Sequence, residues 1–301
     1  MKECLINSQS VPEEFVGELR DSSDVLEDGA EIRKRIEEDG FVFLRSALDT
    51  GEVLSAREEV LERLIAVEEI RPPAVEGITT GKSRRKEMAG DLGTFWQSVC
   101  EGPLLRQVTH GEVIRSVLDK IFGEPSVGQD YIFLRIGVAG RITPLHYDRP
   151  FFARGSNRIV TTWFPLGDVP VSLGPLMVIE GSNQFSDLIG DSKEIDYHSK
   201  SSPRVTLDGD TVALLKERRT RILTADFKAG DMVVFGMKTL HGSLDNNSPE
   251  DRVRVSVDVR YQPSADPKDE RYFGSNPGGT TGVGYGELNG AKPLTEPWHI
   301  R

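Results

Sequence analysis

The spacing of the hydrophobic residues changes near residue 129, and this change restricts the fold more than any other feature. Before it, hydrophobic residues recur at helical spacing, as Ile32 and Ile36 do in "GAEIRKRIEEDG". After it, short runs of β-branched and aromatic residues are separated by glycines and prolines. Such a series of short strands is typical of a sandwich or barrel rather than of alternating strands and helices. We therefore predict a mainly β fold with flanking helices.

We expect these parts to form one domain over residues 1–301. Its predicted segments are a mainly helical N-terminal part at 1–128, a β core at 129–262 with a polar insertion at about 187–220, and a tail at 263–301. The tail contains a GxGxG in "GVGYG", but no strand leads into it and no helix follows. A flexible tail or loop is therefore a better prediction there than a dinucleotide site.

Residues 71–93 interrupt the helical pattern. Prolines and glycines occur here together with the cluster Lys82, Arg84, Arg85 and Lys86. This composition predicts a mobile surface loop whose charges are solvated.

The composition excludes several kinds of partner. The formal net charge is -11, whereas proteins that bind nucleic acid or anionic membranes carry a basic surface. No stretch is long and apolar enough to cross a bilayer, and "MKECLINSQS" lacks the apolar core of a signal peptide. Cys4 and Cys100 are the two cysteines and fit neither a disulfide framework nor a thiolate metal site. We expect a cytoplasmic protein with a small-molecule substrate and with no nucleic-acid or membrane partner; its oligomeric state is left open.

A His-x-Asp tripeptide lies within "PLHYDRPFF". In a strand, residues i and i+2 point the same way, so His146 and Asp148 can present an imidazole and a carboxylate to one ion. By itself the tripeptide has two interpretations: half of a metal site, or an ordinary hydrogen-bonded pair in an acidic protein. A third ligand is needed to decide between them.

A candidate third ligand is His241 in "GDMVVFGMKTLHGS", where a strand-like run ends in a turn. Two histidines and one carboxylate form the facial triad that leaves three positions of Fe(II) open. The chain has five histidines, and we expect His110, His198 and His299 to be surface or structural residues.

A co-substrate such as 2-oxoglutarate carries a distal carboxylate that a buried arginine can bind through two parallel hydrogen bonds. In "RVRVSVDVRY", Arg254 and Ser256 alternate with valines and therefore share one face of a strand. Arg252 shares this face if the strand begins there, but it adjoins the turn-rich "NNSPED". Arg254 is therefore a candidate for this anchor, although a solvated outer face would show the same alternation, and a part for Arg252 stays open.

Several motifs in order resemble the phytanoyl-CoA dioxygenase-like group of Fe(II)- and 2-oxoglutarate-dependent oxygenases. They are "EEDGFVFLRSALDTGEV", the His-x-Asp, "TTWFPL", "GPLMVIEGS" and the "GD" strand that leads to the distal histidine. Where members often have Gly-Ser-His, this chain has Asn183 in place of the histidine. Asp148 is retained, which argues against the halogenase variant in which the carboxylate is missing.

The resemblance implies a double-stranded β-helix, a cupin-like jelly-roll barrel, with the N-terminal helices outside. It implies that His146, Asp148 and His241 bind iron and that Arg254, helped by Ser256, anchors 2-oxoglutarate. The cofactor and co-substrates would be Fe(II), 2-oxoglutarate and O2, with succinate and CO2 as co-products. Hydroxylation is the usual outcome, although desaturation, ring closure or epimerisation can follow the same hydrogen abstraction.

Two other classes of function remain as alternatives. The same triad could serve a cupin-like iron enzyme whose reaction is redox-neutral or independent of 2-oxoglutarate. A non-catalytic binding module is a weaker alternative, because it predicts a broken triad. Arg149, Arg154 and Arg158, together with the cluster at 82–86, raise the hypothesis of a carboxylated or phosphorylated substrate, although charged loops are usually just solvated.

Overall fold

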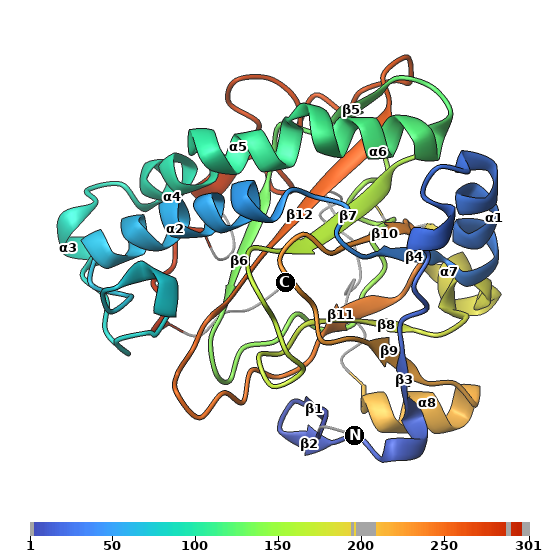
Figure 1. Ribbon diagram of the computed structural model, residues 1–301, viewed down its shortest axis with the longest axis horizontal. Coiled ribbons are helices and arrows are strands. Elements are labelled where there is room, and N and C mark those ends of the chain that lie inside the picture. Colours follow the sequence, from blue (N-terminus) through green and yellow to red (C-terminus); the bar gives the residue numbers. More distant parts are fainter. Residues whose placement is uncertain (1–2, 194–195, 197–208, 287–289, 297–301) are drawn as a thin grey trace.

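The computed structural model (Figure 1) describes residues 3–193, 196, 209–286 and 290–296. Its α-helices are α1 (Gly29–Asp39), α2 (Thr50–Ala66), α3 (Arg85–Met88), α4 (Leu92–Cys100), α5 (Pro103–His110), α6 (Glu112–Phe122), α7 (Ser186–Lys193) and α8 (Thr211–Arg218). Within the described ranges, no helix has both the length and the apolar character needed to cross a bilayer.

Two sheets of mostly antiparallel strands form the centre of the molecule. The larger has the order β4 (Phe41–Leu44), β10 (Met232–Gly236), β7 (Val160–Pro165), β12 (Arg254–Pro263) and β5 (Ser126–Gly128), and β6 (Phe133–Gly137) also pairs with β12. The smaller has the order β11 (His241–Ser243), β8 (Leu176–Ile179), β9 (Ile222–Thr224) and β3 (Val16–Glu18). A separate hairpin joins β1 (Leu5–Ile6) to β2 (Gln9–Ser10).

The fold is the expected mainly β jelly roll with flanking helices, but its strands do not close into one barrel. The hydrogen-bonded strands of the described residues remain in separate sheets. The N-terminal part also supplies strands to both sheets, because β4 pairs with β10 and β3 runs parallel to β9. The predicted strand "FVFLR" thus lies at the edge of the larger sheet.

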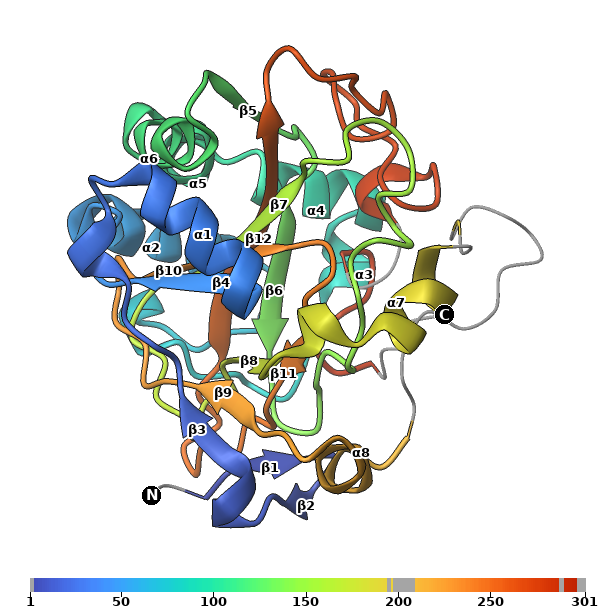
Figure 2. The same ribbon diagram turned by 90° about the vertical axis from the view of Figure 1, so that its right-hand side faces the viewer.

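Each strand of the larger sheet has one face toward the helices and one toward the smaller sheet. Figure 2 shows α1, α2, α5 and α6 on one side of this sheet. Val42 and Val234 belong to the core beneath these helices, whereas Phe43 and Phe235 belong to the core between the sheets. This alternation follows from the two-residue period of a strand, and it explains why runs such as "FVFL" are apolar throughout.

The two ends of α1 follow from the chemistry of the residues that cap it. Asp28 caps α1 by accepting hydrogen bonds from the backbone N–H groups of Ala30 and Glu31, both at 3.1 Å. The helix ends at Gly40, whose φ of 84° is a left-handed conformation that glycine adopts without strain. A Cβ there would also lie 2.8 Å from Thr239 Oγ1, so this position needs glycine for space as well.

Two surface segments differ from what the sequence predicts. Residues 71–93 include α3 and a short 3-10 helix at Ala74–Glu76, and Arg85 is completely buried rather than solvated. The described part of the tail has no regular structure beyond a 3-10 turn at Gly284–Gly286, but it is packed, because Tyr272 and Tyr285 are buried. Helices α7 and α8 lie at the two ends of the predicted insertion, and residues 194–195 and 197–208 of that insertion lie outside the described ranges.

Candidate metal centre

The two histidines of the predicted triad are neighbours through their backbones. His241 begins β11, and His146 lies in the segment that follows β6. His146 N–H donates to the carbonyl of His241 at 2.9 Å, and His241 N–H donates back to the carbonyl of His146 at 3.1 Å. This antiparallel bridge joins residues that are far apart in the sequence, and it places both imidazoles at the same point of the fold.

The triad side chains converge and are buried. One ligand atom from each of His146, Asp148 and His241 lies within 4.8 Å of the others. Asp148 Oδ1 is 3.6 Å from His146 Nε2 and 3.9 Å from His241 Nε2. Two imidazoles and one carboxylate that meet in this way are a donor set suited to a divalent iron ion.

Hydrogen bonds at the far side of each ring fix which nitrogen is available. His146 Nδ1 lies 2.8 Å from the carbonyl oxygen of Pro144, and His241 Nδ1 lies 2.9 Å from that of Thr239. Because a carbonyl oxygen can only accept, each Nδ1 carries the proton. Each Nε2 therefore keeps its lone pair and faces Asp148. Burial lowers the pKa of His241 to about 4, so its ring is neutral at physiological pH.

Asp148 is held by two side chains that the sequence prediction did not single out. Thr161 Oγ1 donates to Asp148 Oδ2 at 2.5 Å, and Arg260 Nη2 lies 3.1 Å from both carboxylate oxygens. Burial by itself raises the pKa of Asp148, but Arg260, His241 and His146 together outweigh burial and hold this pKa well below the usual range. The carboxylate is thus ionised, as a metal ligand must be.

Arg260 is itself fixed by aromatic neighbours. Its guanidinium carbon lies 4.3 Å from the ring centre of Phe133 and 4.8 Å from that of Phe152. Arg260 is also the register partner of Thr161 across β12 and β7, so one cross-strand pair supplies both donors to Asp148. The alternation Arg254, Ser256, Asp258, Arg260 along one strand is the sequence signal that could have pointed to it.

The predicted co-substrate anchor is buried on the same strand. Arg254 and Ser256 are 4% and 0% exposed. Arg254 donates to the carbonyl oxygen of Gly174, while its Nε and the hydroxyl of Ser256 have no hydrogen-bond partner among the described residues. Burial, together with the charge of Arg135, lowers the pKa of Arg254 to about 10, which still leaves it cationic near neutrality. Unpaired buried donors are costly, and a bound carboxylate would satisfy them.

Arg252 and the remaining histidines, the other residues considered in the sequence, do not belong to this buried cluster where the structure describes them. Arg252 precedes β12, is partly exposed, and contacts the carbonyl oxygen of Glu76 at 2.7 Å and Glu250 at 2.8 Å. His110 has its Nε2 3.0 Å from the carbonyl oxygen of Gln129, which is a structural contact. The predictions for His198 and His299 lie outside the described residues.

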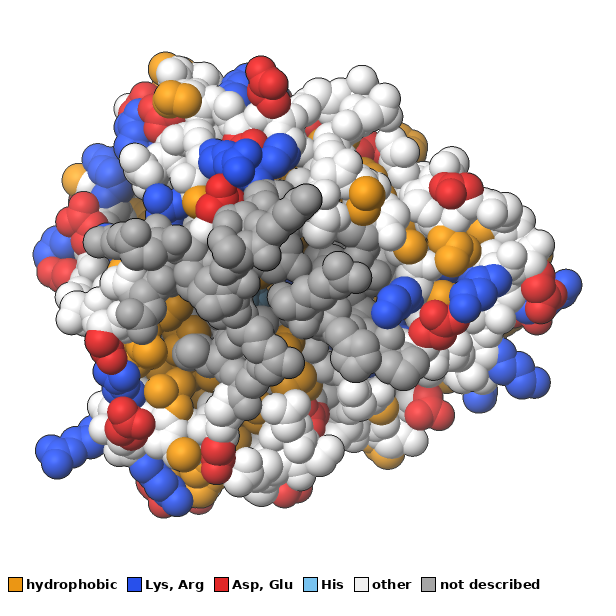
Figure 3. Space-filling model, turned by 180° about the vertical axis from the view of Figure 1, so that it is seen from behind, with side chains coloured by type: hydrophobic (Ala, Val, Ile, Leu, Met, Phe, Trp, Pro, Cys, Tyr) orange, Lys and Arg blue, Asp and Glu red, His pale blue; other side chains and the backbone are white. Residues whose placement is uncertain are grey.

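The charged residues proposed for an anionic substrate are mostly paired. Arg154 contacts Asp196 at 2.8 Å, and Arg158 contacts Glu124 at 2.5 Å as well as Asp266. On the described surface in Figure 3, Lys and Arg side chains are interspersed with Asp and Glu. Arg154 and Arg158 therefore offer little free positive charge to a ligand.

A jelly roll that holds two histidines and one carboxylate at one buried point has the architecture of a mononuclear non-haem iron oxygenase. The comparison with family models gives the family itself. Residues 36–254 match the phytanoyl-CoA dioxygenase (PhyH) family, and the chain belongs to this family. It is accordingly an oxidoreductase.

Two curated relatives extend over most of the chain. One is 1-deoxypentalenic acid 11-beta-hydroxylase from Streptomyces exfoliatus, 24% identical over 262 residues that cover 81% of this chain and 85% of the relative. The other is ectoine dioxygenase from Bordetella parapertussis (strain 12822 / ATCC BAA-587 / NCTC 13253), 28% identical over 232 residues that cover 73% of this chain and 71% of the relative.

Solved structures share the fold. EctD from S. alaskensis in its apoform has a TM-score of 0.55 and 15% identity, over 88% of this chain and 87% of that chain. The epimerase SnoN in complex with Fe3+, alpha ketoglutarate and nogalamycin RO has a TM-score of 0.52 and 19% identity, over 79% of this chain and 84% of that chain.

Proposed function

We propose that this chain is an Fe(II)- and 2-oxoglutarate-dependent dioxygenase that hydroxylates a small-molecule substrate. The observation that carries the proposal is the buried triad together with the unpartnered donors of Arg254 and Ser256 on the strand that also carries Arg260. The overall reaction consumes substrate, 2-oxoglutarate and O2, and it yields hydroxylated substrate, succinate and CO2.

In this proposal, His146, Asp148 and His241 are the protein ligands of Fe(II). When bound, the iron supplies the site where dioxygen and 2-oxoglutarate react to oxidise the substrate. Two neutral imidazoles and one carboxylate leave a single negative charge from protein, so a divalent ion is only partly neutralised and retains affinity for an anionic co-substrate. Arg260 and Thr161 keep Asp148 ionised and fixed in orientation.

Arg254 and Ser256 bind the distal carboxylate of 2-oxoglutarate. The guanidinium fork can make two parallel hydrogen bonds to a carboxylate, and the hydroxyl of Ser256 can donate another. Both groups are buried, which excludes water from this contact and strengthens it.

The substrate class is a diffusible small molecule. This part of the proposal is supported by the names of the relatives, a hydroxylase of 1-deoxypentalenic acid and an ectoine dioxygenase, which act on such compounds. The net charge of -11 is also unfavourable for a polyanionic partner. Soaking candidate metabolites into crystals of the anaerobic iron complex is the direct way to identify the substrate.

The proposal is tested with purified protein, Fe(II) and 2-oxoglutarate without oxygen. We expect a weak visible charge-transfer band from the chelated keto acid, and slow formation of succinate once air is admitted. The Asp148→Ala variant, treated identically, should show neither. Bound iron with no band and no succinate in the unsubstituted protein would contradict the proposal and favour a redox-neutral or 2-oxoglutarate-independent reaction.

A further inference from the structure

The cavity beside Arg254 has a wall that comes from the far end of the chain. Its lining includes Arg254, Arg135 and Thr143, together with Lys292 and Leu294. Lys292 and Leu294 belong to residues 290–296, which we call the C-terminal strap. The strap therefore forms part of the wall of the cavity beside Arg254, the residue to which the proposed function assigns the distal carboxylate of 2-oxoglutarate.

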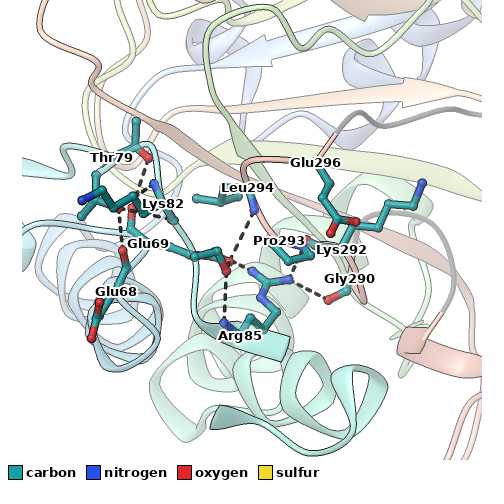
Figure 4. Close-up of polar contacts among 12 residues, drawn as sticks. Glu68, Glu69, Thr79, Lys82, Arg85, Gly290, Lys292, Pro293, Leu294 and Glu296 are labelled. Atoms are coloured by element: carbon teal, nitrogen blue, oxygen red, sulfur yellow. Dashed lines mark hydrogen bonds and ion pairs between the residues drawn. The ribbon is translucent and has the colours of Figure 1, made fainter. Parts of the chain in front are cut away.

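Two arginine side chains hold the strap by its backbone. Arg85 Nη1 donates to the carbonyl oxygens of Gly290 at 3.0 Å and of Lys292 at 2.7 Å. Arg141 Nη2 donates to the carbonyl oxygens of Pro293, at 3.1 Å, and of Glu296. The strap has no helix or strand in its described residues. The two arginines therefore satisfy backbone carbonyl oxygens that backbone N–H groups satisfy in a helix or a sheet. Figure 4 shows Arg85 between the strap and Glu69.

Arg85 is locked in place by a second set of contacts. Its Nη2 lies 2.7 Å from Glu69 Oε2, and both side chains are 0% exposed. The guanidinium carbon lies 5.0 Å from the ring centre of Phe95 and 5.1 Å from that of Trp96. Glu69 also accepts from Ser83 Oγ at 2.6 Å and from the backbone N–H of Leu294 at 3.4 Å. The carboxylate thus contacts both the arginine and the strap.

A buried ion pair of this kind is a poor source of stability, because desolvation offsets much of the attraction. The pair is better explained by what it positions, since Arg85 binds two carbonyl oxygens of the strap through Nη1 while Nη2 binds Glu69. The acceptors that the structure gives to Arg141 and Arg254 are also backbone carbonyls, so both keep a full positive charge beside the cavity. Positive charge at the wall of a cavity favours a carboxylate ligand, and a wall that stays in place would slow the escape of that ligand.

We propose that Arg85 and Glu69 are positioning residues that keep the strap closed over the Arg254 cavity and so set how long 2-oxoglutarate stays bound. Neither residue contacts the co-substrate in this scheme. The inference rests on the proposed function, because it takes Arg254 as the co-substrate anchor.

The chain contains a matched control one residue away. Arg84 contacts Glu68 at 2.9 Å, but the two side chains are 48% and 53% exposed, and neither touches the strap. Replacing both Arg84 and Glu68 by neutral residues removes an ion pair of the same composition from the same two segments. Any effect specific to Arg85 and Glu69 must then come from burial and from the strap.

The experiment compares two double variants, Arg85→Met with Glu69→Gln and Arg84→Met with Glu68→Gln, each loaded with Mn(II) without oxygen. Replacing both partners of an ion pair by neutral residues avoids leaving one unpaired charge buried. The rate of 2-oxoglutarate dissociation is measured by displacement, and hydrogen exchange is followed in a peptide that includes Leu294. For the Arg85/Glu69 variant we expect faster hydrogen exchange in the peptide that includes Leu294. We also expect 2-oxoglutarate to dissociate at least about tenfold faster, which corresponds to about 1.4 kcal/mol. The affinity for Mn(II) should be unchanged. The Arg84/Glu68 variant should match the unsubstituted protein.

Each other outcome contradicts the proposal in a recognisable way. Faster strap exchange with unchanged 2-oxoglutarate dissociation would overturn the positioning role while leaving the proposed function intact. Failure of the unsubstituted, metal-loaded protein to bind 2-oxoglutarate would overturn both. If the Arg85/Glu69 variant does not fold, Arg85→Lys is measured instead, because lysine keeps the positive charge but lacks the planar guanidinium. Faster hydrogen exchange in the strap of Arg85→Lys with an unchanged rate of 2-oxoglutarate dissociation would also contradict the proposal.

Discussion

His146 and His241 donate backbone hydrogen bonds to each other, and this pairing places the two candidate iron ligands side by side. Their imidazoles lie with ring centres 4.3 Å apart, and each Nδ1 is bonded to a carbonyl oxygen two residues earlier in the chain. The backbone pairing and the two carbonyl acceptors together therefore orient both Nε2 atoms toward Asp148.

The first prediction follows from this pairing. Replacing His146, Asp148 or His241 by alanine should abolish tight Fe(II) or Mn(II) binding, because each change removes one of three protein ligands. Calorimetric titration with Mn(II) measures the loss, and circular dichroism should show a folded chain in each case. His110→Gln is the control, since His110 lies at a structural contact with Gln129. Unchanged metal affinity in all three alanine variants would refute the site.

The second prediction separates Arg254 from Arg252. Arg254→Ala should weaken 2-oxoglutarate binding by at least about a hundredfold, or about 2.7 kcal/mol, because a buried contact to a carboxylate is lost. Arg252→Ala should change this affinity little, because Arg252 is partly exposed and pairs with Glu250. Titration of the iron-loaded variants with 2-oxoglutarate without oxygen decides between them, and iron binding should survive in both. The reverse pattern would show that the wrong arginine has been assigned.

The third prediction concerns Arg260. Arg260→Met removes the charge that faces both oxygens of Asp148, and loss of such a partner of a metal ligand typically lowers metal affinity by about ten- to a hundredfold. Thr161→Val removes one hydrogen bond to the same carboxylate and should have a smaller effect. Arg158→Met is the control, because Arg158 is exposed and pairs with Glu124. Equal Mn(II) affinities in Arg260→Met and Arg158→Met would exclude a supporting role for Arg260.

The fourth prediction concerns the stability of the metal-free protein as the pH falls. His241 has an ordinary pKa of about 6.5 in the unfolded chain, but burial lowers its pKa to about 4 in the folded state. Between these values the unfolded state binds more protons, so stability falls as the pH decreases from about 6.5 toward 4. From pH 7.5 to 4.5 this group alone should remove about 2.5 kcal/mol.

Chemical denaturation of the protein and of His241→Gln at both pH values checks this prediction. The variant should lose less stability over the interval, by roughly the amount given by linkage. The pKa of His110 is also lowered by burial, but it contributes equally to both proteins and cancels in the comparison. The same loss of stability in both proteins would mean that His241 is not buried in its neutral form.

The sequence predicted the parts of the site that depend on short-range spacing. The i, i+2 relation of His146 and Asp148, and the alternation that puts Arg254 and Ser256 on one face, follow from strand geometry alone. The same alternation puts Arg260 on this face, but its partner could not be assigned, because Asp148 lies in another segment and meets Arg260 only in the folded chain.

Arg85 illustrates a different limit. It stands among charged neighbours, and such a cluster is usually solvated. Its burial depends on Gly290 and Lys292, more than 200 residues away, whose carbonyls carry no sequence signature. Backbone partners of this kind can be recognised only in the folded chain. The strap and its attachment were therefore beyond what composition and spacing can predict.

The polar face of β12 runs from Arg254 to Arg260, and the opposite face of the same strand carries Val255, Val257 and Val259 in the core beneath the helices. Six residues of extended chain span about 20 Å. The strand therefore fixes the separation along its length between Arg254, the proposed co-substrate anchor, and Arg260, which binds the carboxylate of Asp148. A one-residue insertion between Arg254 and Arg260 would reverse the alternation in the part of the strand beyond it, so one of the two arginines would point toward the helices and valines would point toward the candidate site. This segment should therefore tolerate exchanges of side chain far better than any change in its length.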